Sequence, residues 1–266
     1  MPTLYVRITM KFLEPLVAKM YITLIHSTKG FLVYAELRKN FKVIKRYEAQ
    51  SIAELEMLAK VVKKLERESS ISYIALLETQ AQQGFLPTCQ AIEGVDLSSV
   101  EKVCVDQKWG FYISKDALHD RQKSLKKVGL DFIFSPFSMM HQFHGERLQN
   151  DDGLAVLITP TLVLCSVYKE GVVIFAKETL MQEELLLVEP QVVVKKYVEV
   201  LQKSVQAFYD TKIDDAMFIE KVFIADGVGF ESSFENQLEE ELFVEVSKQS
   251  IDLSHELCIL SEMELT

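Results

Sequence analysis

The chain has 266 residues, of which 48% are hydrophobic and 26% are charged, and its formal net charge is -10. This composition is typical of a folded globular protein and excludes a disordered or fibrous class. The acidic balance argues against nucleic acid as the main ligand, because phosphate binding needs clustered lysine and arginine. It also disfavours broad docking on anionic lipid.

No segment approaches the roughly 20 apolar residues that cross a bilayer. The longest apolar run, residues 154–167, is interrupted by Thr159, Pro160 and Thr161, so we predict no direct membrane insertion. The N-terminal residues lack a charged region followed by a signal-peptide core, and we therefore do not expect secretion.

The cysteines are few and widely separated, a pattern typical of small buried side chains in a reducing compartment. The sequence thus predicts a cytoplasmic protein. The four cysteines are Cys89, Cys104, Cys165 and Cys258.

Residues 1–19 are expected to form an N-terminal appendage, because strand-like alternation from Leu4 to Ile8 is interrupted at Pro15 before the next element. Residues 20–145 are predicted to form a first lobe.

The first lobe begins with three antiparallel strands within residues 21–49, separated by turns at residues 27–30 and 39–40. A capping box at Ser51 and Glu54 predicts the start of a helix. The stretch 71–77 is almost wholly apolar, as expected for a strand that is covered on both faces.

A possible inserted subdomain occupies residues 78–113, with short strand candidates at 103–105 and 110–113. Ser114 is expected to cap a helix that stops at Gly129. A strand at 130–134 and a short helix from Pro136 then lead to a polar linker at 145–153.

The second lobe, residues 153–266, repeats the order of the first, which predicts a duplication. We expect a meander of three strands, a long helix, a fourth strand and a helix opened by a second capping box at Ser232 and Glu235. The expected ranges are 154–158, 162–168 and 172–177 for the meander, 193–208 for the helix, 218–225 for the fourth strand, and 243–246 and 256–260 for two late strands.

This order resembles that of the actin, sugar-kinase and heat-shock ATPase superfamily. Within it, residues 114–143 resemble the PilM-type branch and the cytoplasmic domain of the type II secretion L protein. The matching features are a helix that closes on Gly129-Leu130, a strand, a turn at Pro136, a short helix, and then the second meander. Over roughly residues 20–246, the resemblance implies an α/β, two-lobed, actin-like (duplicated RNase H-like) fold.

Superfamily members that bind ATP present an acid and a glycine from the first hairpin of each lobe to Mg²⁺ and phosphate, and hold adenosine in a Gly-rich turn. The matching first hairpin contains Lys29 and Gly30 but no acid, and the second has Thr159-Pro160-Thr161 in place of Asp-x-Gly. Proline offers no N–H to a phosphate, so we predict that ATP hydrolysis is lost. The candidate cofactor-binding positions are Ser27, Lys29, Gly30, Thr159, Thr161, Asp226, Gly227 and Gly229.

Other candidate sites have simpler explanations. Gly227 and Gly229 also fit an ordinary turn. His141 and His144 are spaced like metal ligands, but no Cys or carboxylate cluster accompanies them, so we predict a packed or surface pair and no metal. No nucleophile elbow or Walker loop occurs, and we predict no catalytic residue. The acidic run at 239–241 is interpreted as a solvated helix face, with a basic partner as the alternative.

The resemblance implies a non-catalytic scaffold or adaptor in a type IV pilus, type II secretion or DNA-uptake platform. Such a subunit binds a short peptide of an inner-membrane assembly protein, contacts the assembly ATPase, and stays in the cytoplasm, peripheral to the membrane through its partners. An alternative is an ATP-binding actin-like protein whose lobe closure is controlled by Mg-ATP. A third possibility is an enzyme that uses a different cleft. The sequence leaves the oligomeric state open.

Overall fold

The computed structural model divides by its contacts into two compact units. The first unit comprises residues 1–82, 113–135 and 252–266, and the second comprises residues 83–112 and 136–251. The predicted appendage lies, up to residue 16, outside the described part of the chain. The structure describes residues 17–27, 29–90, 96, 98–148, 151–211 and 217–265.

The sheet of the first unit has the strand order β3-β2-β1-β4-β8. The first three strands form the predicted antiparallel meander, and β4 and β8 add in parallel next to β1. The strands are β1 (Lys19–Ser27), β2 (Gly30–Lys39), β3 (Lys42–Ile52), β4 (Ser72–Leu77) and β8 (Phe132–Phe134).

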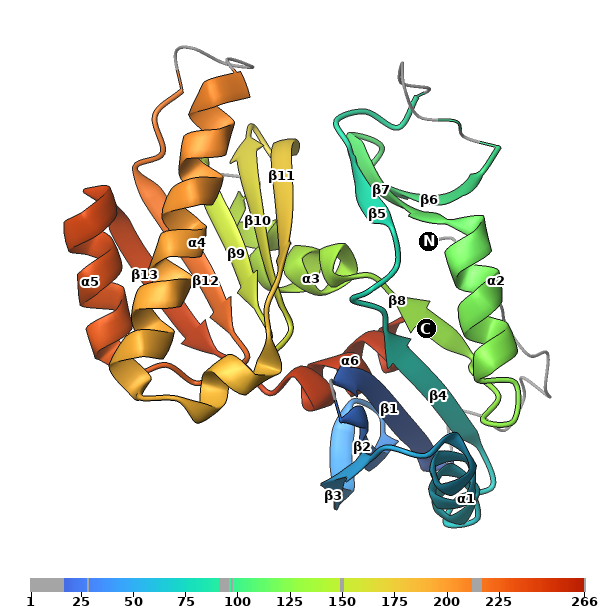
Figure 1. Cartoon of the computed structure of the whole chain (residues 1–266). Coiled ribbons are helices and arrows are strands. Elements are labelled where there is room, and N and C mark those ends of the chain that lie inside the picture. The colour runs from blue at the N-terminus through green and yellow to red at the C-terminus, as the bar shows by residue number, and fades with distance from the viewer. Residues whose placement is uncertain are drawn as a thin grey trace. The chain divides into compact units, whose positions relative to one another are not determined.

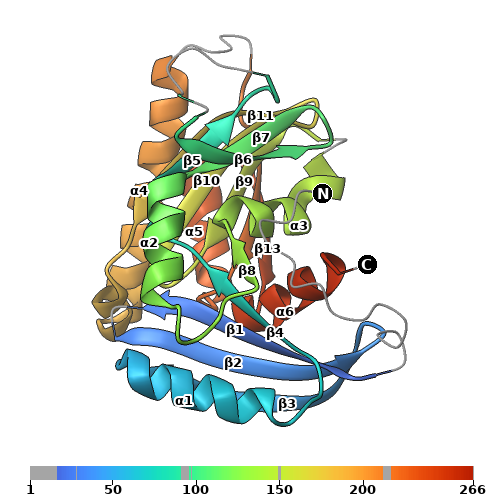
Figure 2. The same ribbon diagram turned by 90° about the vertical axis from the view of Figure 1, so that its right-hand side faces the viewer.

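Helices cover both faces of this first sheet (Figure 2). Met20, Ile22 and Leu24 of β1 pack in one apolar cluster with Leu58 and Val62 of α1. The opposite face of β1, β2 and β4 contacts α6. Because successive strand residues point to opposite faces, double coverage explains why every residue of β1 from Met20 to Ile25 is buried. The helices of this unit are α1 (Leu55–Glu66), α2 (Lys115–Ser124) and α6 (Leu253–Met263).

The second unit repeats the plan, with the strand order β11-β10-β9-β12-β13 (Figure 1). One face packs on α4 and α5 through Val156, Tyr197 and Phe234, and α3 contacts the same sheet at β9, β10 and β12. The strands are β9 (Gly153–Ile158), β10 (Leu162–Lys169), β11 (Val172–Leu180), β12 (Lys221–Asp226) and β13 (Glu245–Ser250). The helices are α3 (Pro136–Leu148), α4 (Pro190–Thr211) and α5 (Ser232–Leu242), with a 3-10 turn η2 (Glu183–Leu187).

The last helix of each half belongs to the unit built by the other half. The helix α3 follows β8 in sequence but packs on β9, β10 and β12, whereas α6 follows β13 and packs on β1, β2 and β4. Residues 136–145 and 252–266, which were expected in the first and second lobes respectively, therefore fall in the opposite units.

The inserted segment forms a small sheet of its own, in the order β5-β7-β6, most of which belongs to the second unit. Trp109 is fully buried there, with its ring edge-on to Tyr168 at 5.9 Å and to His141 at 6.1 Å. The strands are β5 (Gln83–Leu86), β6 (Val100–Val105) and β7 (Trp109–Ser114).

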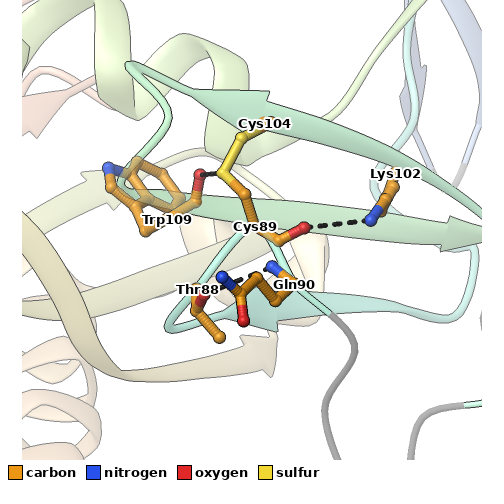
Figure 3. Close-up of a disulfide and its surroundings, with 6 residues drawn as sticks. All are labelled: Thr88, Cys89, Gln90, Lys102, Cys104 and Trp109. Atoms are coloured by element: carbon orange, nitrogen blue, oxygen red, sulfur yellow. Dashed lines mark hydrogen bonds between the residues drawn. A yellow bond between two sulfur atoms is a disulfide. The ribbon is translucent and has the colours of Figure 1, made fainter.

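A disulfide joins Cys89 to Cys104 within this insertion, with their Cα atoms 5.5 Å apart (Figure 3). The Lys102 ammonium donates to the carbonyl oxygen of Cys89 at 3.0 Å. The expectation of small buried thiols is therefore wrong for this pair, because β6 and the segment after β5 lie side by side. Cys165 and Cys258 are free and buried, as expected.

Three expected helix starts had different outcomes. Ser114 does cap α2, since the Ala117 N–H donates to its hydroxyl at 3.4 Å. The capping box at Ser51 is wrong, because Ser51 continues β3 and pairs with Leu32, and the helix starts after Glu54.

The capping box at Ser232 is also wrong, since α5 has Glu231 at its N-cap and no side-chain cap. The late strand expected at residues 256–260 is instead part of helix α6. Its start is fixed by the Asp252 carboxylate, which accepts from the N–H groups of Ser254 and His255 at 3.1 and 3.2 Å. The linker expected at 145–153 begins later, because α3 continues to Leu148.

None of the helices in the described ranges is both long enough and apolar enough to span a membrane.

Candidate functional site

The candidate positions of the second unit meet at one edge of its sheet. Asp226 ends β12 and pairs in parallel register with Ile158, the last residue of β9. The Gly227 N–H donates to the Ile158 carbonyl oxygen at 2.9 Å. Since Thr159 follows Ile158 directly, the Thr159 turn and the Asp226 turn lie next to each other at the carboxyl ends of two parallel strands.

The side chain of Thr159 closes its own turn between β9 and β10. Its hydroxyl oxygen accepts the N–H groups of Thr161 at 3.3 Å and Leu162 at 2.9 Å, and it donates to the Leu162 carbonyl at 3.1 Å. Thr159 is 1% exposed, and Pro160 has no N–H. The amides that this turn would offer to a phosphate therefore already have a protein acceptor.

The Asp226 carboxylate, like the Thr159 hydroxyl, already accepts backbone N–H groups of its own turn. It is fully buried, and it accepts the N–H groups of Val228 and Gly229 at 2.9 Å each and that of Phe230 at 2.6 Å. The Lys248 ammonium lies 3.7 Å from it and also donates to the Phe230 carbonyl. This carboxylate holds the turn in shape and is neutralised by an internal cation.

Glycine at position 229 is required by the backbone. Its φ is +85°, a conformation that side chains with a Cβ rarely adopt. Among the described residues, apart from its two chain neighbours, no heavy atom lies within 4 Å of the place that a Cβ would take, so the turn is open on that side.

The remaining candidate positions form the hairpin turn between β1 and β2, in the first unit. The Ser27 hydroxyl accepts the N–H of Lys29 at 3.2 Å. A Cβ at Gly30 would lie 2.2 Å from the carbonyl oxygen of Ile52, so this glycine is needed for the close approach of two backbones. The contacts of Ser27 and Gly30 are those of a packed hairpin.

The first unit contains a counterpart of the Asp226 turn that was not predicted from the sequence. Glu78 directly follows β4, is 2% exposed, and accepts the N–H groups of Gln80 and Ala81 at 2.8 and 3.0 Å. The Arg121 guanidinium donates to it at 2.5 Å. An acidic residue at the end of each fourth strand was the available signal, but its basic partner is distant in sequence.

His144 is packed against the second sheet, near Val156 and Phe223, whereas the ring of His141 lies edge-on to Trp109 of the inserted sheet. His144 is 4% exposed, its Nε2 lies 3.4 Å from the Val156 carbonyl, and burial lowers its pKa to about 4. Burial also lowers the pKa of His141. Within the described ranges, no three His, Cys, Asp or Glu side chains are grouped so as to hold a metal ion.

Several polar side chains of β10 and β11 are buried without partners. The Ser166 hydroxyl, the Tyr168 hydroxyl and one Glu178 oxygen have no hydrogen-bond partner among the described residues. Glu178 pairs in register with Leu164, and Ser166 is on the same face of the sheet. Burial raises the pKa of the Glu178 carboxyl to about 7.

Replacing Glu178 with Gln is expected to stabilise the protein at pH 8 and to have little effect at pH 5. Because the folded-state pKa is raised, the wild type loses stability as the pH rises from the unfolded value towards 7, by on the order of 2 kcal/mol. Urea denaturation of both proteins at the two pH values measures this. An equal difference at pH 5 and pH 8 would show that the charge of Glu178 is not the cause.

Two family models match separate parts of the chain. The first is described as Domain of unknown function (DUF8569) and matches residues 17–141. The second is described as Domain of unknown function (DUF8341) and matches residues 167–266. No curated protein matches the chain in sequence.

Solved structures resemble the chain over almost its whole length. One is a Bacteroides thetaiotaomicron protein with actin-like ATPase fold and unknown function, with a TM-score of 0.57, 8% identity and coverage of 96% of this chain and 99% of that one. Another is the PilM-PilN type IV pilus biogenesis complex, with a TM-score of 0.56, 12% identity and coverage of 90% and 94%. The chain thus has the predicted two-lobed actin-like α/β fold, with two mixed sheets that each begin with a β-meander.

Proposed function

We propose that this chain is a non-catalytic adaptor with an actin-like fold, which works by binding other proteins of a membrane assembly platform. The platform is of the type IV pilus, type II secretion or DNA-uptake kind. In this role the chain holds a short peptide of an inner-membrane assembly protein and contacts the assembly ATPase. Its location is the cytoplasm, peripheral to the inner membrane through its partners.

The observation that carries this proposal is the closed turn at Thr159. Its hydroxyl already accepts the amides of Thr161 and Leu162, and Pro160 supplies none. The neighbouring Asp226 carboxylate is fully buried, accepts three backbone N–H groups and lies 3.7 Å from the Lys248 ammonium. Both of its oxygens therefore already have protein partners, and neither is free to bind Mg²⁺. A protein that keeps the actin-like fold without these ligands is more readily explained by binding than by hydrolysis.

The structural likeness to PilM in the PilM-PilN complex supports the choice of a protein partner. A cytoplasmic location also has a consequence for the insertion. Since the cytoplasm keeps cysteine pairs reduced, the proposal implies that the disulfide between Cys89 and Cys104 in the structure is open in the cell.

A second candidate function is ATP binding without hydrolysis, with the nucleotide controlling lobe closure. It is favoured by the Asp226-Gly229 turn, which follows a buried strand and is open beside Gly229. Isothermal titration with Mg-ATP separates the two functions. The adaptor proposal expects no binding up to about 1 mM nucleotide, which corresponds to a binding free energy weaker than about -4 kcal/mol.

Micromolar Mg-ATP binding that is lost on Gly227→Val would replace the adaptor proposal by the ATP-binding one. The partner is tested separately, by co-purification of the tagged chain with a single-span inner-membrane assembly protein and a secretion ATPase of such a platform from the same organism. We expect the tagged chain to retain both proteins, and retention of neither would contradict the assigned role.

A further inference from the structure

The hairpin turn between β2 and β3 displays an aromatic side chain where the equivalent turn has glycine. Lys39 pairs with Lys42, and the two residues between them, Asn40 and Phe41, both have positive φ, 50° and 61°. The equivalent turn between β10 and β11 has Glu170 and Gly171 in the same conformation, at 53° and 73°. Turns of this type favour glycine, because a Cβ is strained there.

Burial does not offset the strain at Phe41, because this residue is 51% exposed. Two side-chain hydrogen bonds fix the backbone of Phe41 instead. The Phe41 N–H donates to the Glu262 carboxylate at 2.8 Å, and the Arg38 guanidinium donates to the Phe41 carbonyl at 3.3 Å. A fixed backbone therefore presents a half-exposed aromatic residue at the tip of the hairpin, a combination that suggests a binding role.

A second apolar side chain lies close by in sequence on β3. Ile44 is 55% exposed and falls at the register shift opposite Leu37 and Arg38. Such a bulge turns a side chain out of the regular alternation. Phe41 in the turn and Ile44 near the start of β3 are thus both exposed.

The surroundings of these two residues are basic, although the whole chain is acidic. Lys39 and Lys42 are exposed, and the side chains of Lys45 and Arg46 are 55% and 59% exposed. Arg46 is partly neutralised by Glu36 and Lys45 by Glu68, whereas Lys39 and Lys42 flank the tip directly. We call Lys39, Phe41, Lys42, Ile44, Lys45 and Arg46 the β3 surface.

The position of β3 in its sheet suits an extended partner. This strand is the outermost one in the order β3-β2-β1-β4-β8, and most of its residues from Lys42 to Ser51 are exposed. The bulge near the tip breaks continuous strand pairing there, so side-chain contacts must supply much of the binding.

We propose that the β3 surface docks an extended acidic peptide segment, whose apolar residues contact Phe41 and Ile44 while its carboxylates face the lysines. This inference rests on the proposed adaptor role and names the surface and the chemistry of the partner. The basic side chains of the β3 surface favour an acidic segment, and the exposed outermost strand favours a segment in an extended conformation.

The test uses the full chain and a fluorescein-labelled ten-residue peptide in which Glu and Asp alternate with Leu and Val. Fluorescence anisotropy is expected to show binding that weakens with salt, and no binding of the matching peptide with Lys and Arg in place of the acids. Phe41→Gly should weaken binding roughly 10-fold or more. It should not lower the urea midpoint, because glycine is the residue at the equivalent turn position, Gly171.

A charge reversal of Lys42 and Lys45 to Glu is expected to weaken binding similarly, whereas the same reversal at Lys63 and Lys64 of α1 should not. The inference is overturned if the acidic peptide fails to bind at about 1 mM, if Phe41→Gly binds it unchanged, or if the basic peptide binds equally well. It is also overturned if phosphatidylglycerol vesicles bind through Phe41 and the peptide does not. Co-purification of the platform proteins with Phe41→Gly would leave the adaptor role intact but place the partner elsewhere.

Discussion

Replacing Asp226 with Ala is expected to lower the free energy of unfolding by about 3–5 kcal/mol, because the change breaks a buried charge pair and leaves its partners unsatisfied. Three backbone N–H groups lose their acceptor, and Lys248, whose side chain is 10% exposed, keeps the Phe230 carbonyl but has Glu235 at 3.7 Å as its remaining carboxylate. Urea denaturation monitored by circular dichroism measures the loss.

Asp252→Ala is the matched control. The Asp252 carboxylate also accepts two backbone N–H groups, but at an exposed helix start, so its removal should cost only about 1 kcal/mol. A double-mutant cycle with Asp226→Asn and Lys248→Met isolates the ion pair. If Asp226→Ala costs no more than Asp252→Ala, the carboxylate is not the organiser of the turn, and a ligand role for it becomes tenable again.

Part of the candidate site could be predicted from the sequence, and part of it could not. The Asp226-Gly229 turn was predictable, because a buried strand followed by Asp-Gly-x-Gly is a local pattern. Its neutralisation was not, since Lys248 lies 22 positions along the chain, on β13, and only the parallel pairing of β12 with β13 brings it there. The closure of the Thr159 turn depends on one side-chain rotamer, which composition and spacing do not determine.

The two β-meanders could be predicted for a related reason. Each is made of neighbouring strands whose apolar alternation and turn residues are local, and both appear as expected. Helix α6 was missed because residues 257–260 are apolar without interruption while its buried face includes the polar Ser254, Ser261 and Glu262, so the apolar residues do not mark a helical period. The cap at Asp252 was the overlooked signal.

The exchange of terminal helices between the two halves could not be read from the sequence. Both α3 and α6 carry apolar residues that fit any sheet, and nothing local specifies which sheet they cover. In α6 the choice is linked to polar partners, because Glu262 meets Arg38 across 224 positions of sequence. Long-range pairs of this kind supply specificity that apolar patterning lacks.

Replacing Arg38 with Met is expected to be as damaging as Asp226→Ala, lowering the free energy of unfolding by about 3–5 kcal/mol at pH 7. Arg38 is 2% exposed and donates to Glu262 at 2.7 Å and to Glu36 at 2.5 Å. Met fills a similar volume, so the loss comes mainly from electrostatics. The buried Glu262 carboxylate loses its ion pair with Arg38, and Glu36 keeps Arg46 at 3.1 Å and His255 at 2.8 Å. Limited proteolysis should then cleave α6 sooner than in the wild type, because Glu262 anchors that helix.

The pH dependence separates this electrostatic cause from lost packing. Burial alone would raise the pKa of Glu36, but the hydrogen bonds from Tyr34, Arg38 and His255 outweigh it and hold that pKa below its usual value. A lowered folded-state pKa stabilises the protein above the unfolded value near 4.3 and ceases to do so as the pH falls through the folded value. Without Arg38 the Glu36 carboxylate protonates more easily, so the difference between wild type and Arg38→Met should shrink between pH 7 and pH 4. A difference that is the same at both pH values would assign the loss to packing, and Arg38→Lys, which keeps the charge, should then be as damaging as Met.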